Sequence, residues 1–170
     1  DLTVNVAEVN LIKGEVKKSN DTDIATGNVF GGGKGQNEDT STDPTTPEYT
    51  AQVTGGTTVI LDGATVKNAI YGGCNVRGDV LGGTTVTLSS GVVGNSAATT
   101  IDDVVFGGGL GQNTTVTGDV IVNVGTKTEI TPATDPKTYN YEGNTLIYGS
   151  VYGCSKEGSV HSIATNSTDK

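Results

Sequence analysis

Methionine and tryptophan are absent from this chain of 170 residues, and aromatic residues make up only 5% of it. So few aromatic side chains exclude a large aromatic-lined cleft. Only one histidine, His161, is present, and no Ser-His or Cys-His arrangement accompanies it, so nucleophilic hydrolysis has little support. The two cysteines, Cys74 and Cys154, are too few to build a zinc site with that histidine. We therefore expect no enzyme activity, no metal and no cofactor.

Long hydrophobic runs and an excess of positive charge are missing as well. No apolar stretch approaches membrane-spanning length, and the residues after Asp1 do not resemble a signal peptide. Ten Lys and Arg against 19 Asp and Glu give a net charge of −9, which disfavours nucleic acid and anionic membranes as partners. Because the chain does not begin with Met, we expect a mature product or an excised fragment.

The chain is rich in glycine, with 26 residues, and contains an internal repeat. An aromatic residue followed by glycines occurs in NVFGGG, AIYGGC, VVFGGG and SVYGCS. The anchors are 41, 35 and 46 residues apart, at Phe30, Tyr71, Phe106 and Tyr152. Units of this length without helical periodicity indicate a stacked repeat architecture.

A second unit follows each anchor: VTGGTTVIL from Val53, VLGGTTVTL from Val80, VTGDVIVNV from Val116 and a weaker VHSIATN from Val160. Polar and apolar residues alternate in TTVTL, which predicts a strand with Thr85 and Thr87 on one face and Val86 and Leu88 on the other. The first residues, DLTVNV, overlay DVIVNV at 119–124. We therefore expect the chain to enter and to leave the repeat partway.

Short strands at a fixed repeat predict an all-β fold, a parallel β-helix (β-solenoid) of about four irregular rungs. The four anchor aromatics then form one interior stack. We expect residues 1–170 to be a single domain, a segment of a longer array, with inserts at 37–50 and 126–144 projecting from its corners. The alternative is an antiparallel β-sandwich or barrel, which also uses short strands and Gly-rich turns.

The runs GGGKGQN at Gly31 and GGGLGQN at Gly107 come near two known ligand motifs. A phosphate loop would end in Gly-Lys-Ser/Thr before a helix, and a calcium nonapeptide would carry Asp where Asn37 and Asn113 stand. Neither pattern is complete. We expect the glycines to mark a corner where positive φ or close backbone approach excludes a Cβ.

Cys74 and Cys154 follow their aromatics at nearly equivalent places but belong to rungs that are two spacings apart. About 9 to 10 Å is too far for a disulfide, so we expect buried free thiols. Arg77-Gly78-Asp79 is the tripeptide that integrins recognise in exposed loops. Its alignment with residues 158–160 predicts the start of a packed strand and a coincidental match.

Two further patterns are weak. Asp102-Asp103 is the one adjacent carboxylate pair, and strand neighbours point to opposite faces, so at most one faces a cleft. Threonines are expected to stack into outward rows that resemble ice-binding solenoids, although the inserts spoil a flat plane; these are Thr57, Thr58, Thr84, Thr85, Thr114 and Thr115.

The motifs VFGGGxGQ, VxGGTTVxL and IYGGC, with IYGSVYG from Ile147, resemble the glycine-rich repeats of large bacterial cell-surface adhesin-like proteins, particularly those of Bacteroidetes. The likeness runs from Asn28 to Val160 without the inserts. It implies an exported, extracellular β-helical stalk or filament segment, and no catalytic residues carry over. Cys74 and Cys154 depart from it, since glycine is usual there.

The leading functional interpretation is therefore an extracellular structural or adhesive protein at the cell surface. Its partners would be other copies or flanking repeats, joined end to end, and a glycan or host surface protein bound by the inserts through Tyr49, Tyr139 and Tyr141. The alternative is a carbohydrate-binding or polysaccharide-cleaving β-helix. A carboxylate cluster with Arg77 in a concave site would favour that alternative.

Overall fold

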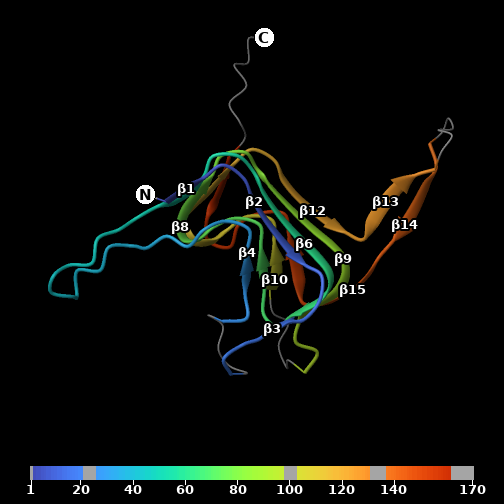
Figure 1. Cartoon of the computed structure of the whole chain (residues 1–170), viewed down its shortest axis with the longest axis horizontal. Helices are drawn as coiled ribbons and strands as arrows, with labels where there is room; N and C mark the ends of the chain where they lie inside the picture. The colour runs from blue at the N-terminus through green and yellow to red at the C-terminus, as the bar shows by residue number, and fades with distance from the viewer. Residues whose placement is uncertain (1, 21–25, 98–102, 131–136, 162–170) are drawn as a thin grey trace, which may run out of the picture.

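The computed structural model describes residues 2–20, 26–97, 103–130 and 137–161, which form seventeen β-strands and no helix. The strands are shown in Figure 1, and their bounds in chain order are β1 (Leu2–Val4), β2 (Ala7–Leu11), β3 (Glu15–Val16), β4 (Val29–Phe30), β5 (Ala51–Val53), β6 (Thr57–Val66), β7 (Ile70–Tyr71), β8 (Asn75–Val80), β9 (Thr84–Gly94), β10 (Asp103–Phe106), β11 (Leu110–Thr117), β12 (Val120–Val124), β13 (Thr126–Glu129), β14 (Tyr139–Glu142), β15 (Asn144–Tyr148), β16 (Ser150–Tyr152) and β17 (Ser159–His161).

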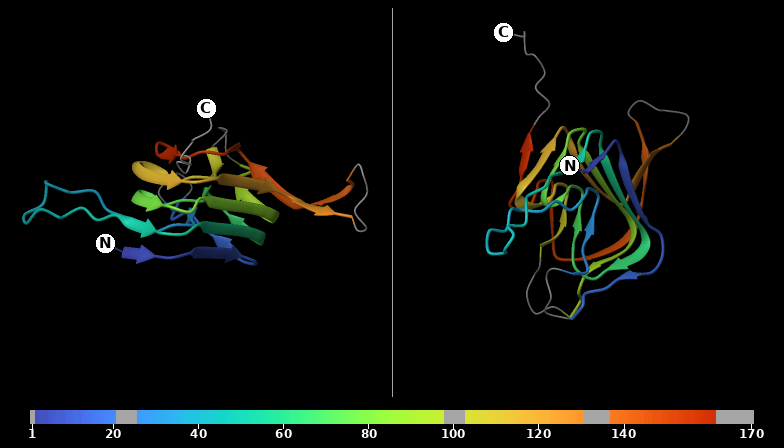
Figure 2. Two further views of the ribbon diagram at one scale, coloured as in Figure 1. Left: turned by 90° about the horizontal axis from the view of Figure 1, so that it is seen from above. Right: turned by 60° about the vertical axis from the view of Figure 1, so that its left-hand side comes forward.

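Three parallel sheets contain all but two of these strands. Sheet one has the order β1-β5-β8-β11-β17, and sheet three has the order β16-β10-β7-β4. Sheet two has the order β12-β9-β6-β2, with β3 beside β6 and β15 beside β9. The chain passes from sheet to sheet and returns one strand further on, so equivalent strands lie in layers (Figure 2). We call one such circuit, for example β5, β6 and β7, a rung.

The pairing is parallel in all three sheets, so the antiparallel sandwich or barrel is wrong for this chain. The registers also confirm the alignment of the second repeat unit. Thr57 lies opposite Thr84, and Thr84 lies opposite Val120. In sheet one, Val53, Val80 and Val116 form a corresponding column.

The alternation predicted for TTVTL is also found. Val86 and Leu88 are fully buried, whereas Thr85 and Thr87 are half-buried on the outer face. Successive rungs stack their inward Val and Leu side chains into one core, and each such side chain stabilises the fold by about 1.5–3 kcal/mol relative to exposure. The buried members of this core are Val29, Val59, Leu61, Ala64, Val66, Ile70, Val86, Leu88, Val93, Val104 and Val105.

The predicted overlay of residues 1–6 on 119–124 is wrong by five positions. Ala7 pairs with Thr57, whose column continues through Thr84 to Val120, so β2 is the equivalent of β12. Leu2 instead pairs with Ala51 in sheet one. The pattern V-N-V matched by chance because alternating valines look alike in both sheets, and only the cross-strand register distinguishes them.

Both predicted inserts extend beyond the sheets. Residues 36–49 form an arm, held by antiparallel bridges between Gln36 and Tyr49 and between Asp39 and Thr46. The second insert leaves sheet two after β12 and forms the antiparallel hairpin β13–β14, in which Thr126 pairs with Glu142 and Glu129 with Tyr139. The arm and the hairpin project on opposite sides of the sheets (Figure 1).

Apolar side chains are exposed at both ends of the layered sheets. One end carries Val4, Val6 and Ile12, which are 50%, 61% and 69% exposed. The other end carries Val124, Leu146, Tyr148, Val151, Tyr152 and Val160. Among the described residues, no strand pairs with the outer edges of β2, β4, β12 or β16, so these edges present unpaired backbone groups.

Candidate functional site

The four anchor aromatics lie one above another in sheet three. Ring centroids are 4.8 Å apart between Phe30 and Tyr71, 5.1 Å between Tyr71 and Phe106, and 5.0 Å between Phe106 and Tyr152, with near-parallel rings. These separations match the strand spacing of a sheet. Tyr71 and Phe106 are buried, while Tyr152 at the end of the stack is 38% exposed. The stack is a structural element and offers no cleft.

Two of the glycines that follow the aromatics are required by close backbone approach. A Cβ on Gly72 would lie 2.0 Å from the carbonyl oxygen of Gly107, and Gly31 meets Gly72 in the same way. Neither residue has positive φ, so only one of the two expected reasons applies. In the two phosphate-loop-like runs, the N–H of Gly31 donates to the carbonyl of Tyr71, and the N–H of Gly107 donates to that of Tyr152. These amides are engaged between rungs, which leaves no phosphate cradle at the two corners.

The two cysteines are free, but only Cys74 is buried, so the prediction of two buried thiols is wrong for Cys154. The inter-rung hydrogen bonds place Cys154 in the column of Gly73 and Gly108 rather than in that of Cys74. A one-residue offset on a strand-like segment reverses the side that a side chain faces. Burial raises the pKa of Cys74 to about 11.

The threonine rows are split between two faces, which corrects the prediction of outward rows. Thr57, Thr84 and Thr114 are buried, whereas Thr58 and Thr85 are half-buried on the outer face. The Thr84 hydroxyl donates to the carbonyl of Gly107 at 2.6 Å, and the Thr57 hydroxyl makes the corresponding bond to Gly72. The hydroxyls of Thr57 and Thr84 therefore tie sheet two to glycine corners, whereas that of Thr114 donates to Gly111 within β11.

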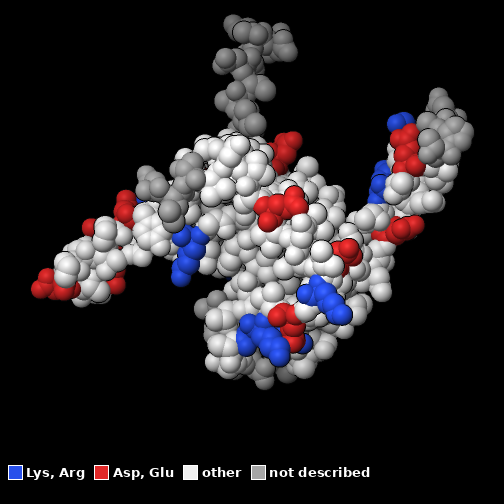
Figure 3. Space-filling model, viewed as in Figure 1, with Lys and Arg blue, Asp and Glu red and all other residues white. Residues whose placement is uncertain are grey.

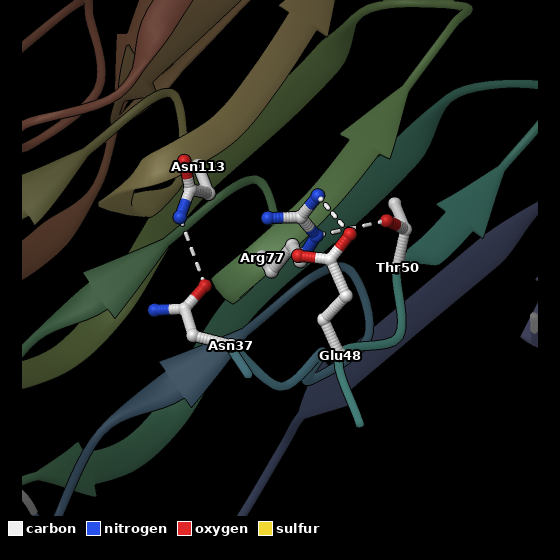
Figure 4. Close-up of polar contacts among 5 residues, drawn as sticks. All are labelled: Asn37, Glu48, Thr50, Arg77 and Asn113. Carbon is white, nitrogen blue, oxygen red and sulfur yellow. Dashed lines mark hydrogen bonds and ion pairs between the residues drawn. The ribbon is translucent and has the colours of Figure 1, made fainter. Parts of the chain in front are cut away.

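Arg77-Gly78-Asp79 lies within β8 rather than at a loop tip. Gly78 is buried, and the column Val80, Val116, Val160 confirms the predicted alignment with the last repeat. The Arg77 Nη2 atom lies 3.1 Å from Glu48 Oε1, and its Nε–H donates to the Thr50 hydroxyl at 3.2 Å (Figure 4). The guanidinium therefore fastens the base of the arm to sheet one.

A second contact holds the arm to the next rung. The Asn113 amide nitrogen donates to Asn37 Oδ1 at 2.8 Å, on the same outer face (Figure 4). Beside these contacts lie two shallow depressions of about 250 and 370 Å³. The smaller one is lined by Thr50, Arg77, Asp79, Gln112, Asn113 and Thr115. Its polar groups include hydroxyls, amides and charges of both signs, which suits hydrogen bonding to a polar ligand.

A larger notch of about 500 Å³ lies between the hairpin and the outer face of sheet two. Its lining includes Thr87, Asn123, Val124, Lys127 and Tyr141. Tyr141 is the most exposed of the three predicted contact tyrosines. It is 73% exposed, whereas Tyr49 is 37% exposed and Tyr139 is half-buried. Aromatic, amide, hydroxyl and ammonium groups are thus gathered at one place.

Tyr139 and Tyr141 lie on one face of the hairpin. Their ring centroids are 6.3 Å apart, and the Lys127 ammonium lies 3.8 Å from the centroid of the Tyr139 ring. Such cation–π contact favours one position of the lysine. Tyr139 therefore supports its neighbours, while Tyr141 presents its ring to solvent. The structure brings these two tyrosines together and leaves Tyr49 at the base of the other insert.

Acidic and basic side chains are interspersed over the face drawn in Figure 3, and the tip of the arm is acidic. Glu15 lies 3.1 Å from Lys67 and 3.5 Å from Lys17, and hydrogen bonding to Lys67 lowers its pKa. Hydrogen bonds from Ser41 likewise lower the pKa of Asp39 in the arm. The two ion pairs of Glu15 neutralise part of the basic charge locally.

The described residues contain no group of three His, Cys, Asp or Glu side chains that could hold a metal ion. Asp102 of the predicted carboxylate pair lies outside the described residues, and Asp103 is described only as the first residue of β10. The described ranges also contain no helix that is long and apolar enough to cross a membrane.

Sequence reasoning found Tyr139 and Tyr141 but missed Thr87, Asn123 and Lys127. The aligned units VTGDVIVNV and VLGGTTVTL already placed Asn123 and Thr87 in one column, which the register confirms. Asn123 and Thr87 both stand at outward positions of that column, next to the start of the insert at 126–144, and this placement could have indicated that they lie beside the insert. Lys127 needed the hairpin register, which pairs it with Tyr141.

Comparison of the sequence with protein-family profiles and with characterised proteins, and of the structure with solved structures, gave no match.

Proposed function

We propose that the three parallel sheets are the walls of a parallel β-helix, a β-solenoid of about four irregular rungs. The continuous ladders of sheets one, two and three support this architecture, because each adds one strand per repeat. The aromatic stack at strand spacing and the shared core of inward Val and Leu residues support it as well.

The proposed role is that of an extracellular structural or adhesive segment of a surface protein, without catalytic activity. The likeness of its repeats to those of bacterial surface adhesins supports this role, as does the engagement of its corners in inter-rung contacts. Arg77, the one arginine, is committed to Glu48 and Thr50. Adhesive contacts would come from the two inserts, which project away from the walls.

The observation that carries the structural role is the exposure of apolar core-type side chains at both ends of the layered sheets. An end with exposed valines and unpaired strand edges is stabilised when a further rung covers it. We propose that further rungs of the same kind occupy both ends, supplied by flanking repeats or by other copies. Tyr152 would then gain a stacking partner on its open ring face.

The experiment is negative-stain electron microscopy of the purified chain across a concentration series. Uniform filaments that lengthen with concentration would show that copies of this chain cover the ends. Single particles at every concentration would assign that position to flanking repeats, since about four rungs at a spacing of about 4.8 Å give one copy a height of only about 20 Å. Irregular aggregates without a constant width would contradict the proposed stacking of rungs.

The rival function is a glycan-binding or glycan-cleaving wall. One observation favours binding, namely the notch beside the hairpin with its exposed tyrosine. Cleavage gains less support, because the guanidinium beside the arm is tied to Glu48 by an ion pair. Incubation with polysaccharides followed by chain-length analysis separates the two, since a binding protein leaves the polymer length unchanged.

A further inference from the structure

The two inserts differ in whether their polar groups already have protein partners. Beside the arm, Arg77 is bound to Glu48 and Thr50, and Asn37 is bound to Asn113. A ligand in those depressions would have to compete with these contacts. Breaking a formed hydrogen bond offsets most of the gain from a new one.

Polar groups at the hairpin notch are less engaged. The side-chain amide nitrogen of Asn123 donates to the Thr87 hydroxyl at 3.4 Å, which is long for a hydrogen bond. The side-chain oxygen of Asn123, Oδ1, accepts no hydrogen bond from the described residues. The Tyr141 hydroxyl also has no hydrogen-bond partner there. These groups are free to bind a ligand, and the notch is also the largest of the depressions described above, at about 500 Å³.

The chemistry of this notch fits a sugar ring. An exposed tyrosine ring offers a flat apolar surface on which the C–H face of a pyranose packs. Asn123 and Thr87 offer one amide and one hydroxyl at the side, which pair with sugar hydroxyls. Lys127 adds an N–H donor above Tyr139. Apolar platform and polar rim are the two components that small-molecule sites combine.

Two features fix the position of this surface. Lys127 stacks on Tyr139, and the two tyrosine rings lie 6.3 Å apart at an interplanar angle of 51°, so the residues support one another. The opposite wall is β12, which pairs in register with β9 from Val120 to Val124. A site that is held in place loses less conformational entropy when a ligand binds.

We propose that the notch between the hairpin β13–β14 and the outer face of sheet two binds a neutral saccharide, with Tyr141 as the stacking platform and Asn123 and Thr87 as hydrogen-bonding groups. The net charge of −9 disfavours acidic glycans at long range. This inference rests on the proposed adhesive role and narrows it to one insert and one class of ligand.

The test is saturation-transfer NMR followed by titration with tetrasaccharides of glucose, mannose, galactose and N-acetylglucosamine, and with tetragalacturonate as the acidic probe. We expect saturable binding of at least one neutral tetrasaccharide and a preference for it over the acidic one. Tyr141→Ala should raise the Kd about tenfold or more, because truncated aromatic anchors carry much of a binding energy. Tyr141→Phe, which keeps the ring, should stay within about threefold of the parent.

Matched variants make the outcomes distinguishable. Asn123→Ala should also weaken binding, whereas Tyr49→Ala, on the other insert, should leave the Kd unchanged. Circular dichroism and the unfolding midpoint check that each variant is folded, and the exposure of Tyr141 makes its truncation tolerable.

Three results would overturn the inference: no saturable binding of any neutral probe, a Kd that Tyr141→Ala does not change, or stronger binding of tetragalacturonate. Loss of binding in Tyr49→Ala with retention in Tyr141→Ala would also overturn it, yet would leave an adhesive role for the arm. Filament formation by electron microscopy reports on the structural role independently of all these titrations.

Discussion

Replacing Gly72 with alanine tests the close packing of the rungs. The added Cβ would lie 2.0 Å from the carbonyl oxygen of Gly107 and 3.1 Å from the Cβ of Thr84. The first separation is far below any normal contact, and the clashing atom belongs to the backbone. A change of side-chain rotamer therefore cannot relieve the clash, and the two rungs that contain Gly72 and Gly107 must move apart.

The size of the effect follows from what this movement disturbs. Overpacking of a well-packed interior costs about 1–3 kcal/mol. The N–H of Gly72 donates to Phe106 and that of Gly73 donates to Gly108, at 2.9 and 3.0 Å, and each weakened bond adds about 0.5–1.5 kcal/mol. We expect Gly72→Ala to lower the free energy of unfolding by about 2–6 kcal/mol.

Gly153 provides the matched control, because it follows Tyr152 as Gly72 follows Tyr71 and a Cβ there meets nothing within 4 Å. Gly153→Ala should be neutral or stabilise by up to about 1 kcal/mol, since alanine restricts the unfolded chain. Urea unfolding followed by circular dichroism measures both variants. Equal effects at the two positions, or a change below about 1 kcal/mol for Gly72→Ala, would refute the stacked glycine column.

Other predictions concern the buried thiol and the inward threonines. A thiol reagent should label Cys154 in the folded protein and Cys74 only after unfolding, because only Cys74 is buried. Burial raises the pKa of Cys74 from 9.0 to about 11, so the thiol of the unfolded chain ionises first as the pH rises. Relative to the Cys74→Ala variant, the free energy of unfolding should therefore fall by about 2 kcal/mol between pH 9 and 11. A flat difference across that range would contradict this environment. Thr84→Val should cost about 1–2 kcal/mol through loss of the bond to Gly107, whereas the outward Thr85→Val should change stability by less than about 0.5 kcal/mol.

The parallel sheets, the register of the second repeat unit and the aromatic columns were accessible from the sequence because they repeat. Val53, Val80 and Val116 recur with similar neighbours, which indicates similar environments in successive rungs. Alternation in TTVTL then assigned the two faces of β9 correctly. Self-similarity thus carried long-range information that a single strand does not contain.

Features that depend on a single residue of register were not accessible. Cys154 follows its aromatic by two residues and Cys74 by three, which puts them in different columns, and Cys154 also lies in the end rung, where Tyr152 is exposed as well. The inward direction of Thr57 and Thr84 follows from the same alternation as that of Val59 and Val86, but their bonds to glycine carbonyls of another sheet were not accessible. The notch was missed because it joins a wall to an insert, and the hairpin pairing of Lys127 with Tyr141 has no counterpart in the other repeats.

Cysteine cross-linking between neighbouring rungs tests the stacked solenoid most directly. Thr58 and Thr85 are outward partners in register on β6 and β9, and neighbouring strands lie about 4.8 Å apart, within the range that a disulfide spans. In a Cys154→Ser background, Thr58→Cys with Thr85→Cys should form an intramolecular disulfide on mild oxidation. The pair Thr58→Cys with Asn123→Cys should stay reduced. Asn123 lies on β12, one rung beyond β9, and pairs with Thr87 rather than with Thr85, so it is too far from Thr58 for a disulfide. Cross-linking of the second pair but not the first would contradict the proposed stacking of rungs.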